Sequence, residues 1–237
     1  MKKAIIIGAS SGIGRALAME LVSEGYHIGI VGRRASLLES SKSEHPDHLT
    51  IGNFDVLEPD IPNRLDALVA SLGGLDVLVI SAGTGELNPT LAPEHIEKTN
   101  ALNVDAFSRL AVWGYRLFQA QGHGHLVTIS SLAGLRGGGI APSYNATKAY
   151  QLNFLEGLRQ KNQKERTGLI LTDVRPGFVD TAMAKGEGRF WVAPVEKAAR
   201  QIAKAIRNEK EVVYITKRWR LIALLLKILP TWLYKRF

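Results

Sequence analysis

The sequence predicts a single α/β domain built on a doubly wound parallel sheet of about seven strands flanked by helices. Three observations support this fold class. Apolar runs of strand length alternate with segments of helical pattern along most of the chain, as in β-α-β units. A glycine-rich turn joins the first strand run to the first helical segment. With 237 residues, 46% of them hydrophobic, the chain can bury one large core but is short for two domains.

The elements follow one another in a regular order. Strands are predicted over residues 3–7, 26–31, 50–54, 75–80, 125–130, 169–174 and 211–215. Helices are predicted over residues 15–24, 35–44, 61–71, 95–119, 143–165 and 195–208. Pro194 precedes the last of these helices and is a good helix opener. Parallel strands need right-handed crossovers, so we expect helices on both faces of the sheet.

The turn after the first strand has the composition of a nucleotide-binding loop. Gly8 allows a tight exit from the strand, Gly12 lets a pyrophosphate approach bare backbone, and Gly14 lets the following helix pack close to the sheet. The free N–H groups and the dipole of the helix N-terminus favour an anion there. The residues expected to hold a dinucleotide are Gly8, Ser10, Ser11, Gly12, Ile13 and Gly14.

A second group of reactive side chains lies in the middle of the chain. Tyr144 and Lys148 are one helical turn apart, on one face, and Ser131 ends a strand thirteen residues before Tyr144. An ammonium group beside a phenol favours the phenolate, so a tyrosine whose pKa is normally ~10 can exchange protons nearer neutrality. This arrangement is that of a proton donor poised over an alcohol or ketone.

Together, the glycine turn, Ser131 and the Tyr144-x-x-x-Lys148 motif resemble the short-chain dehydrogenase/reductase family, of the single-domain Rossmann type. The resemblance covers nearly the whole chain, from Lys3 to about Tyr214. It implies an oxidoreductase that interconverts a carbonyl and an alcohol by hydride transfer, with Tyr144 as general acid/base. The implied catalytic set is Asn103, Ser131, Tyr144 and Lys148.

Two of these assignments have close competitors in the sequence. By resemblance Asn103 holds a water in the proton path to Lys148, and Asn100 is its neighbour on the same predicted helix. Ser131 is preferred over Ser130 because thirteen residues is the commoner separation in the family. Strand alternation points the two serines to opposite faces, so only one can reach a substrate.

The chain departs from the family pattern at two positions. Ile7 stands where the family usually has Thr, and Ser81 stands where Asn usually precedes Ala82. Both positions lie near the carboxyl edge of the predicted sheet. We interpret them as a local change in the hydrogen bonds that support the loops.

The end of the second strand favours NADP(H) as the cofactor. Arg33 and Arg34 follow Gly32 there, with no carboxylate to accept hydrogen bonds from the ribose. A guanidinium at this point can bind a 2′-phosphate bidentately. The resemblance adds contacts to adenine, to the adenine ribose and to the nicotinamide half, where Lys148 would bind the ribose. These further residues are Asp55, Val56, Ser81, Ala82, Gly83, Tyr144, Lys148, Pro176, Gly177, Val179 and Thr181.

The expected substrate is a small apolar carbonyl compound or alcohol. Candidates for the pocket wall, or equally for core, are Leu132, Leu135, Phe178, Met183, Phe190 and Trp191. Residues 181–190, which include Gly186 and Gly188, are predicted to form a mobile lid. The resemblance also implies a homodimer or homotetramer, assembled through the long helices that contain Asn103 and Tyr144.

The C-terminal segment differs in character from the rest of the chain. Residues 1–216 are expected to form the domain, and residues 217–237 a tail with six Lys/Arg and no acidic residue. The tail supplies six of the net +8 charge and leaves +2 for the domain, so a nucleic-acid partner is not expected. Lys227 interrupts an apolar stretch that is too short to span a bilayer.

The tail has the pattern of a helix that lies in the headgroup region of a membrane, because a narrow basic stripe borders a broad apolar face with flanking Trp219 and Trp232. Pro230 should kink or end this helix. The alternative is a helix packed on its own domain or on a partner subunit.

The remaining features limit location and chemistry. The first apolar run, residues 4–7, is too short for a signal peptide, so we expect a cytoplasmic protein that is peripheral at the membrane surface. No metal site is expected, and His123 and His125 are predicted to be surface residues. Two other functions fit the same fold: a non-redox epimerase or dehydratase that uses the same tyrosine and lysine, and a catalytically idle NADP(H)-binding regulator, against which the complete catalytic set argues.

Overall fold

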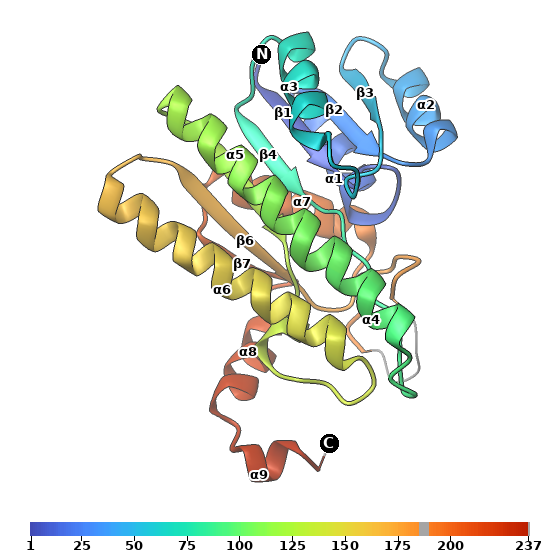
Figure 1. Ribbon diagram of the computed structural model, residues 1–237, viewed down its shortest axis with the longest axis vertical. Helices are drawn as coiled ribbons and strands as arrows, with labels where there is room; N and C mark the ends of the chain where they lie inside the picture. The colour runs from blue at the N-terminus through green and yellow to red at the C-terminus, as the bar shows by residue number, and fades with distance from the viewer. Residues whose placement is uncertain (185–189, 237) are drawn as a thin grey trace.

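A computed structural model describes residues 1–184 and 190–236 and confirms the predicted fold class (Figure 1). Seven parallel strands form one sheet in the order β3-β2-β1-β4-β5-β6-β7. The strands are β1 Lys3–Ile7, β2 His27–Gly32, β3 Leu49–Asn53, β4 Val77–Ile80, β5 His125–Ile129, β6 Ile170–Pro176 and β7 Val212–Ile215. The order of the strands reverses between β1 and β4, which is where α/β sheets of this type bind ligands.

Helices cover both faces of the sheet, as expected. The core on one face includes residues of α1, α2 and α7, and the core on the other includes residues of α3, α5 and α6 (Figure 1). The helices of the domain are α1 Gly12–Ser23, α2 Ala35–Glu44, α3 Ile61–Leu72, α4 Pro93–Asn100, α5 Phe107–Gln121, α6 Pro142–Glu165 and α7 Val195–Arg207. Two short helical turns complete the domain: η1 Ala101–Ala106 and η2 Leu132–Leu135.

The central strands are apolar throughout because both faces of the sheet are covered. In β1, Ala4 and Ile6 belong to one core while Ile5 and Ile7 belong to the other. Successive side chains of a strand point to opposite faces, so the run of Ile residues contributes to both layers. Ile7 therefore packs in the α3–α5–α6 core.

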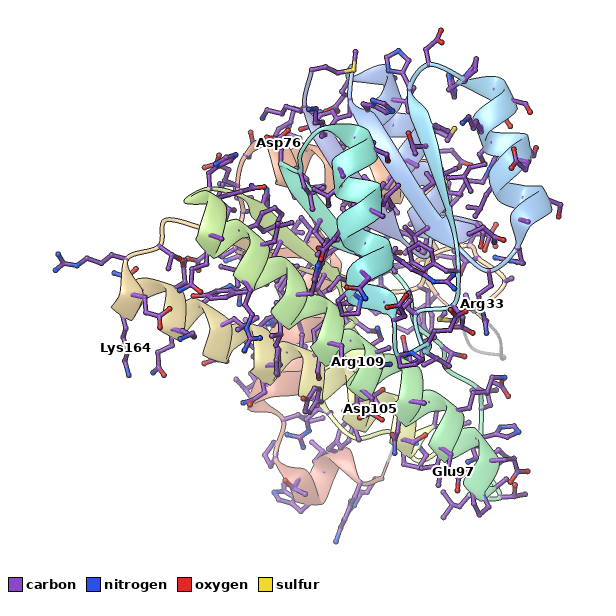
Figure 2. All side chains as sticks on the ribbon, turned by 45° about the horizontal axis from the view of Figure 1, so that its top comes forward. Arg33, Asp76, Glu97, Asp105, Arg109 and Lys164 are labelled. Atoms are coloured by element: carbon purple, nitrogen blue, oxygen red, sulfur yellow. The ribbon has the colours of Figure 1, made fainter. Side chains whose placement is uncertain are left out.

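One predicted helix differs from the structure in its interior. Residues 95–119 were expected to form a single helix, but α4 and α5 are joined by η1, which is a π-helical turn. Glu97, Asp105 and Arg109 are exposed along the outer side of this rod (Figure 2), while Asn103 points into the protein and is 0% exposed. Widened turns of this kind are frequent at functional sites.

The tail folds as α8 Trp219–Ile228 and α9 Thr231–Tyr234, and Pro230 separates the two helices as predicted. Trp219 and Ala223 are buried against Leu132 of the domain. Within residues 1–184 and 190–236, we find no helix that combines the length and the apolar character needed to cross a membrane.

Two further predictions can be compared with the structure. His125 is buried at the start of β5, where its Nε2 lies 2.7 Å from Thr172 Oγ1, so the prediction of a surface residue is wrong for His125. A central parallel strand is covered on both faces, and even its first residue is enclosed. Gly186 and Gly188, the glycines of the predicted lid, lie outside the described residues.

Candidate active site

The predicted functional residues gather at the carboxyl ends of the central strands. Gly8 follows β1, Ser81 follows β4, Ser131 follows β5, and Pro176 ends β6. Backbone hydrogen bonds extend the sheet into these loops, from Ser81 N to Ile7 O at 2.8 Å and from Gly8 N to Val31 O at 2.9 Å. Residues far apart in sequence therefore meet at one edge of the sheet, beside the point where the strand order reverses. Sheets of this type bind ligands in a crevice at that point.

The glycines of the first loop are required by close backbone contacts. Gly8 has a φ of +90°, and a Cβ atom there would lie 2.6 Å from the Ala82 nitrogen. A Cβ atom on Gly14 would lie 2.2 Å from the Gly8 carbonyl oxygen. Gly12 instead faces the Thr181 side chain, 3.4 Å from a Cβ position, so the loop borders the predicted nicotinamide segment.

The two arginines after β2 have different partners. Arg34 donates hydrogen bonds to Ser10 Oγ at 2.7 Å and to Ser11 Oγ at 2.6 Å, which brings its guanidinium onto the glycine loop. Arg33 lies 3.4 Å from the Asp55 carboxylate, and its side chain is largely exposed (Figure 2). The predicted adenosine-binding residues from three loops are thus adjacent, with Arg34 next to the serines.

Tyr144 and Lys148 lie in the first two turns of α6, with the Lys148 Nζ 5.8 Å from the centre of the Tyr144 ring. Ser131 lies near enough to Tyr144 to influence its pKa, and the Ser131 Oγ accepts a hydrogen bond from Ala133 N at 3.1 Å. Ser130 is oriented differently and donates to the buried Asp173 carboxylate. The structure therefore brings Ser131, Tyr144 and Lys148 together and directs Ser130 away from them.

Burial dominates the electrostatics of this group. Burial raises the pKa of Tyr144 above its ordinary value, and the nearby Ser131 hydroxyl opposes this only in part. Contrary to the prediction from sequence, the ammonium group does not bring the pKa of this phenol toward neutrality. Burial lowers the pKa of Lys148 to about 8, against the opposing charge of Asp173. Near pH 7, Tyr144 is thus protonated and Lys148 is mostly charged.

Asn103 connects η1, the π-helical turn between α4 and α5, to the loop after β4. Its side chain donates to Thr84 O at 2.7 Å and to Thr147 Oγ1 at 3.0 Å, and accepts from Thr84 N at 2.9 Å. Asn100 is exposed. Of the two candidate asparagines, Asn103 is the one at the site, and it holds the loop against α6.

Two residues of the site were missed by the sequence analysis. A Cβ atom on Gly85 would lie 2.4 Å from Tyr144 Cδ2, so this glycine lets the loop pass directly over the phenol ring. Gln151 is buried beside Lys148 and accepts a hydrogen bond from its Nζ at 2.9 Å. A polar residue three positions after Lys148, on the inner face of α6, was the available signal for Gln151.

The tail helix forms one wall near the site. The Trp219 indole covers Gly177, directly after β6, and its ring centroid lies 5.6 Å from that of Phe178, 5.0 Å from Phe190 and 5.8 Å from Trp191. Three of the predicted pocket residues thus form an aromatic cluster with Trp219, while Met183 is exposed. Trp219 was not among the predicted pocket residues.

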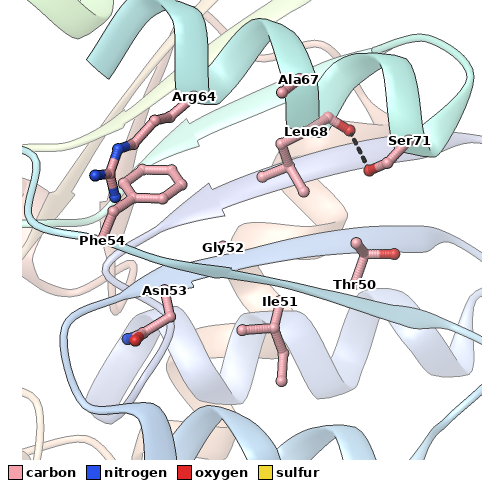
Figure 3. A pocket seen from close by; sticks show the side chains of 9 residues that line it. All are labelled: Thr50, Ile51, Gly52, Asn53, Phe54, Arg64, Ala67, Leu68 and Ser71. Carbon is pink, nitrogen blue, oxygen red and sulfur yellow. Dashed lines mark hydrogen bonds between the residues drawn. The ribbon is translucent and has the colours of Figure 1, made fainter. Parts of the chain in front are cut away.

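A separate cavity of about 520 Å³ lies at the β3 edge of the sheet, between β3 and α3 (Figure 3). Arg64 covers the Phe54 ring at its rim, 5.8 Å from the ring centre. Since β3 is at the opposite side of β1 from β5, this cavity is distinct from the crevice at Tyr144. Within the described part of the chain there is no cluster of three or more His, Asp or Glu side chains that could hold a metal ion.

Comparisons with known proteins agree with this geometry. The short chain dehydrogenase family model matches residues 2–190. A Myxococcus xanthus protein described as an uncharacterized oxidoreductase is 34% identical over 188 residues, which cover 77% of this chain and 74% of the relative. The chain therefore belongs to the short-chain dehydrogenase family, a family of oxidoreductases.

Solved structures share the fold at low identity. The apo form of LigD from Sphingobium sp. strain SYK-6 has a TM-score of 0.83 at 23% identity, over 95% of this chain and 94% of LigD. A structure of ElxO with NADP bound has a TM-score of 0.79 at 21% identity, over 90% of this chain and 96% of ElxO.

Proposed function

We propose that this protein is an NADP(H)-dependent oxidoreductase that interconverts a carbonyl and an alcohol, with Tyr144 as the general acid/base. The observation that carries the proposal is the grouping of Ser131, Tyr144 and Lys148 at the carboxyl edge of the sheet, beside the glycine loop. Membership of an oxidoreductase family supports the reaction class.

The residues at the crevice fit a dinucleotide phosphate. Gly8 and Gly14 keep the loop close to the sheet, and the first turn of α1 has no acidic residue to repel an anion. Arg34 with Ser10 and Ser11 offers a cation and hydroxyls to a 2′-phosphate. ElxO, which has the same fold, has been solved with NADP bound.

The catalytic roles follow from the contacts of the side chains. When bound, NADPH would supply the hydride for the carbonyl carbon. Ser131 and Tyr144 would hold the substrate oxygen by hydrogen bonds, and the raised pKa of Tyr144 keeps the phenol available as the proton donor for reduction. The charged Lys148 would bind the nicotinamide ribose and favour the tyrosinate left after proton transfer.

The test is NADPH consumption over a panel of ketones and aldehydes, with wild-type protein and Tyr144→Phe. We expect kcat/KM to fall by about 10²- to 10⁴-fold in Tyr144→Phe, because the general acid is removed, with NADPH affinity unchanged. The matched control is Tyr150→Phe, since the exposed Tyr150 hydroxyl bonds only to Ser108 among the hydrogen bonds described. Bound NADPH that is not consumed with any carbonyl would favour the regulator or the non-redox enzyme instead.

We further propose that the tail contacts an anionic membrane surface through the outer face of α8. Leu224 is 58% exposed and Ile228 is 68% exposed, on the side away from the buried Trp219. After Glu211 the sequence contains only basic charged residues, so its charge complements anionic lipid headgroups. Because Trp219 covers part of the domain, this proposal and packing on the domain are compatible.

A co-sedimentation assay with vesicles containing anionic lipid tests this contact. The double variant Leu224→Ser/Ile228→Ser should stay in the supernatant while the wild type pellets. Removing residues 217–237 would expose Leu132, so substitutions on the outer face are the cleaner test. The control Leu37→Ser/Leu57→Ser changes exposed leucines of the domain. Equal pelleting of the wild type and the tail variant would refute the contact.

We also propose a homodimer or homotetramer assembled through α5 and α6. These helices lie side by side on one face of the sheet (Figure 1), and an exposed Tyr150 stacks on Phe154 with ring centroids 5.7 Å apart. Light scattering after size-exclusion chromatography should give a multiple of 25.9 kDa. A mass of one chain at micromolar concentration would contradict this assembly.

A further inference from the structure

Gln151 is a buried polar side chain beside Lys148, the cationic residue of the proposed catalytic set. It lies on the inner face of α6, one turn after Lys148, and is 1% exposed. Burying an amide is costly unless its polar atoms find partners. Both ends of this amide have partners, which indicates a defined orientation.

The partners of Gln151 belong to the two sides of the site. Its Oε1 accepts a hydrogen bond from Lys148 Nζ at 2.9 Å, and its Nε2 donates to the Asn103 carbonyl oxygen at 2.9 Å. Lys148 Nζ also donates to Ile129 O at 3.2 Å. An ammonium group has three donors, so one remains to point toward a ligand in the crevice.

The contact between Gln151 and the Asn103 carbonyl also connects Lys148 to the loop after β4. Asn103 lies in the π-helical turn η1, and its side chain clamps Thr84 in the loop after β4. Gln151 thus links the ammonium of Lys148 to the same residue that positions this loop.

We propose that Gln151 is a positioning residue for the reaction: its amide oxygen fixes the Lys148 ammonium between β5 and α6 and stabilises its charged form. The role in turnover rests on the proposed function. An uncharged acceptor in a buried site favours the charged form of an amine, because a hydrogen bond donated by an ammonium group is stronger than one donated by the neutral amine.

The effect of Gln151 on Lys148 can be measured separately from the effects of the neighbouring titratable groups. Tyr144 on α6 is protonated, and Asp173 on β6 is paired with Arg175 at 2.6 Å and bonded to Ser130. Asp105 on η1 is exposed to solvent. Substitutions at Gln151 leave all of these groups in place.

Two substitutions should move the pKa of Lys148 in opposite directions. Gln151→Met keeps the length of the side chain but removes the acceptor, which lowers the pKa of a buried amine by about one to two units. Gln151→Glu places a carboxylate beside the ammonium and raises the same pKa. Gln119→Met is the matched control, because Gln119 is also on a helix but bonds to Glu165 at the surface.

The pKa of Lys148 is measured by an NMR titration of protein labelled with ¹³C-lysine, with the Lys148 signal assigned through Lys148→Arg. The alkaline limb of kcat/KM for reduction should shift in the same direction as this pKa, downward in Gln151→Met and upward in Gln151→Glu. If Gln151→Met does not fold, the upward shift in Gln151→Glu decides the matter.

If the pKa of Lys148 is unchanged in the folded variants, the proposal is overturned, even if activity falls. Loss of activity without a change in this pKa is what a purely structural residue would give. If the wild type turns over no carbonyl compound but the titrations move as expected, the proposed function fails while the role of Gln151 in holding Lys148 stands.

Discussion

The position of Arg34 predicts how this protein distinguishes NADPH from NADH. Its guanidinium reaches Ser10 and Ser11 at 2.7 and 2.6 Å, so a phosphate bound on these serines would lie within reach of its N–H groups. A hydrogen bond to a charged group contributes about 1.5–3 kcal/mol, or about 10- to 150-fold in Kd. Because Arg34 is exposed and screened by solvent, we expect the lower part of this range.

Arg34→Gln should therefore weaken NADPH binding about 10- to 30-fold and leave NADH binding within about twofold, as measured by fluorescence titration at constant ionic strength. Arg33→Gln is the matched comparison. Arg33 already faces Asp55 at 3.4 Å and is largely exposed, so its loss should cost NADPH binding no more than about threefold.

Comparing NADPH with NADH distinguishes two roles for Arg34: recognition of the 2′-phosphate charge, and support of the glycine loop. If Arg34 served only to fix the glycine loop through Ser10 and Ser11, Arg34→Gln would weaken both cofactors by the same factor. That result, or an unchanged affinity for NADPH, would refute the assignment of the 2′-phosphate to this arginine.

Three further substitutions test other parts of the structure. Gly85→Ala should lower kcat/KM by about 100-fold, because its methyl group would lie 2.4 Å from the Tyr144 ring and displace the phenol. Trp219→Ala should destabilise the fold by about 3–5 kcal/mol in urea denaturation, against less than about 0.5 kcal/mol for the exposed Trp232→Ala. Burial lowers the pKa of His125 to about 4. Because a histidine in the unfolded chain binds its proton near pH ~6.5, the free energy of unfolding should fall by about 2–3 kcal/mol between pH ~6.5 and ~4.5. The fall should be smaller in His125→Leu.

Each of these has a control or a contrary result. Gly137→Ala serves beside Gly85→Ala, because a Cβ atom on Gly137 would meet nothing within 4 Å. Loss of activity in both variants would show that the effect is not specific to the phenol ring. Equal stability of the Trp219→Ala and Trp232→Ala variants would argue against packing of the tail on the domain. If His125→Leu loses as much stability as the wild type between pH ~6.5 and ~4.5, the pH dependence belongs to other groups.

The fold was predictable because each signal was local. The run of Ile residues in β1 and the glycines that follow it predict a buried strand and a tight turn without knowledge of the rest of the chain. The bounds of β1 and α2 were predicted without error. Motif spacing likewise grouped Ser131, Tyr144 and Lys148, which the structure brings together.

What escaped prediction depends on contacts between distant segments. The π-helical turn at Asn103 has an ordinary helical sequence, and its partner Gln151 is 48 residues away. His125 looked like a surface residue because burial of a strand end is decided by the neighbouring elements. The tail sequence showed an amphipathic helix, but only the structure shows that Trp219 faces inward.

The pKa of Tyr144 could not be predicted from the sequence for the same reason. Proximity of Lys148 in sequence predicts a lower pKa, whereas the enclosure of the phenol by surrounding segments raises it. Desolvation depends on everything packed around a group, so it cannot be read from two residues one turn apart.

The most direct test of the central claim follows the hydride and the proton together. Wild-type protein is incubated with [4,4-²H₂]NADPH and a panel of ketones and aldehydes, and the products are analysed by mass spectrometry. We predict one deuterium on the carbinol carbon of a product alcohol, formed by the wild type and by Tyr150→Phe but at least about 100-fold more slowly by Tyr144→Phe. Deuterated alcohol formed by Tyr144→Phe at the wild-type rate would contradict the role of Tyr144, and bound NADPH with no deuterium in any product would contradict the reaction itself.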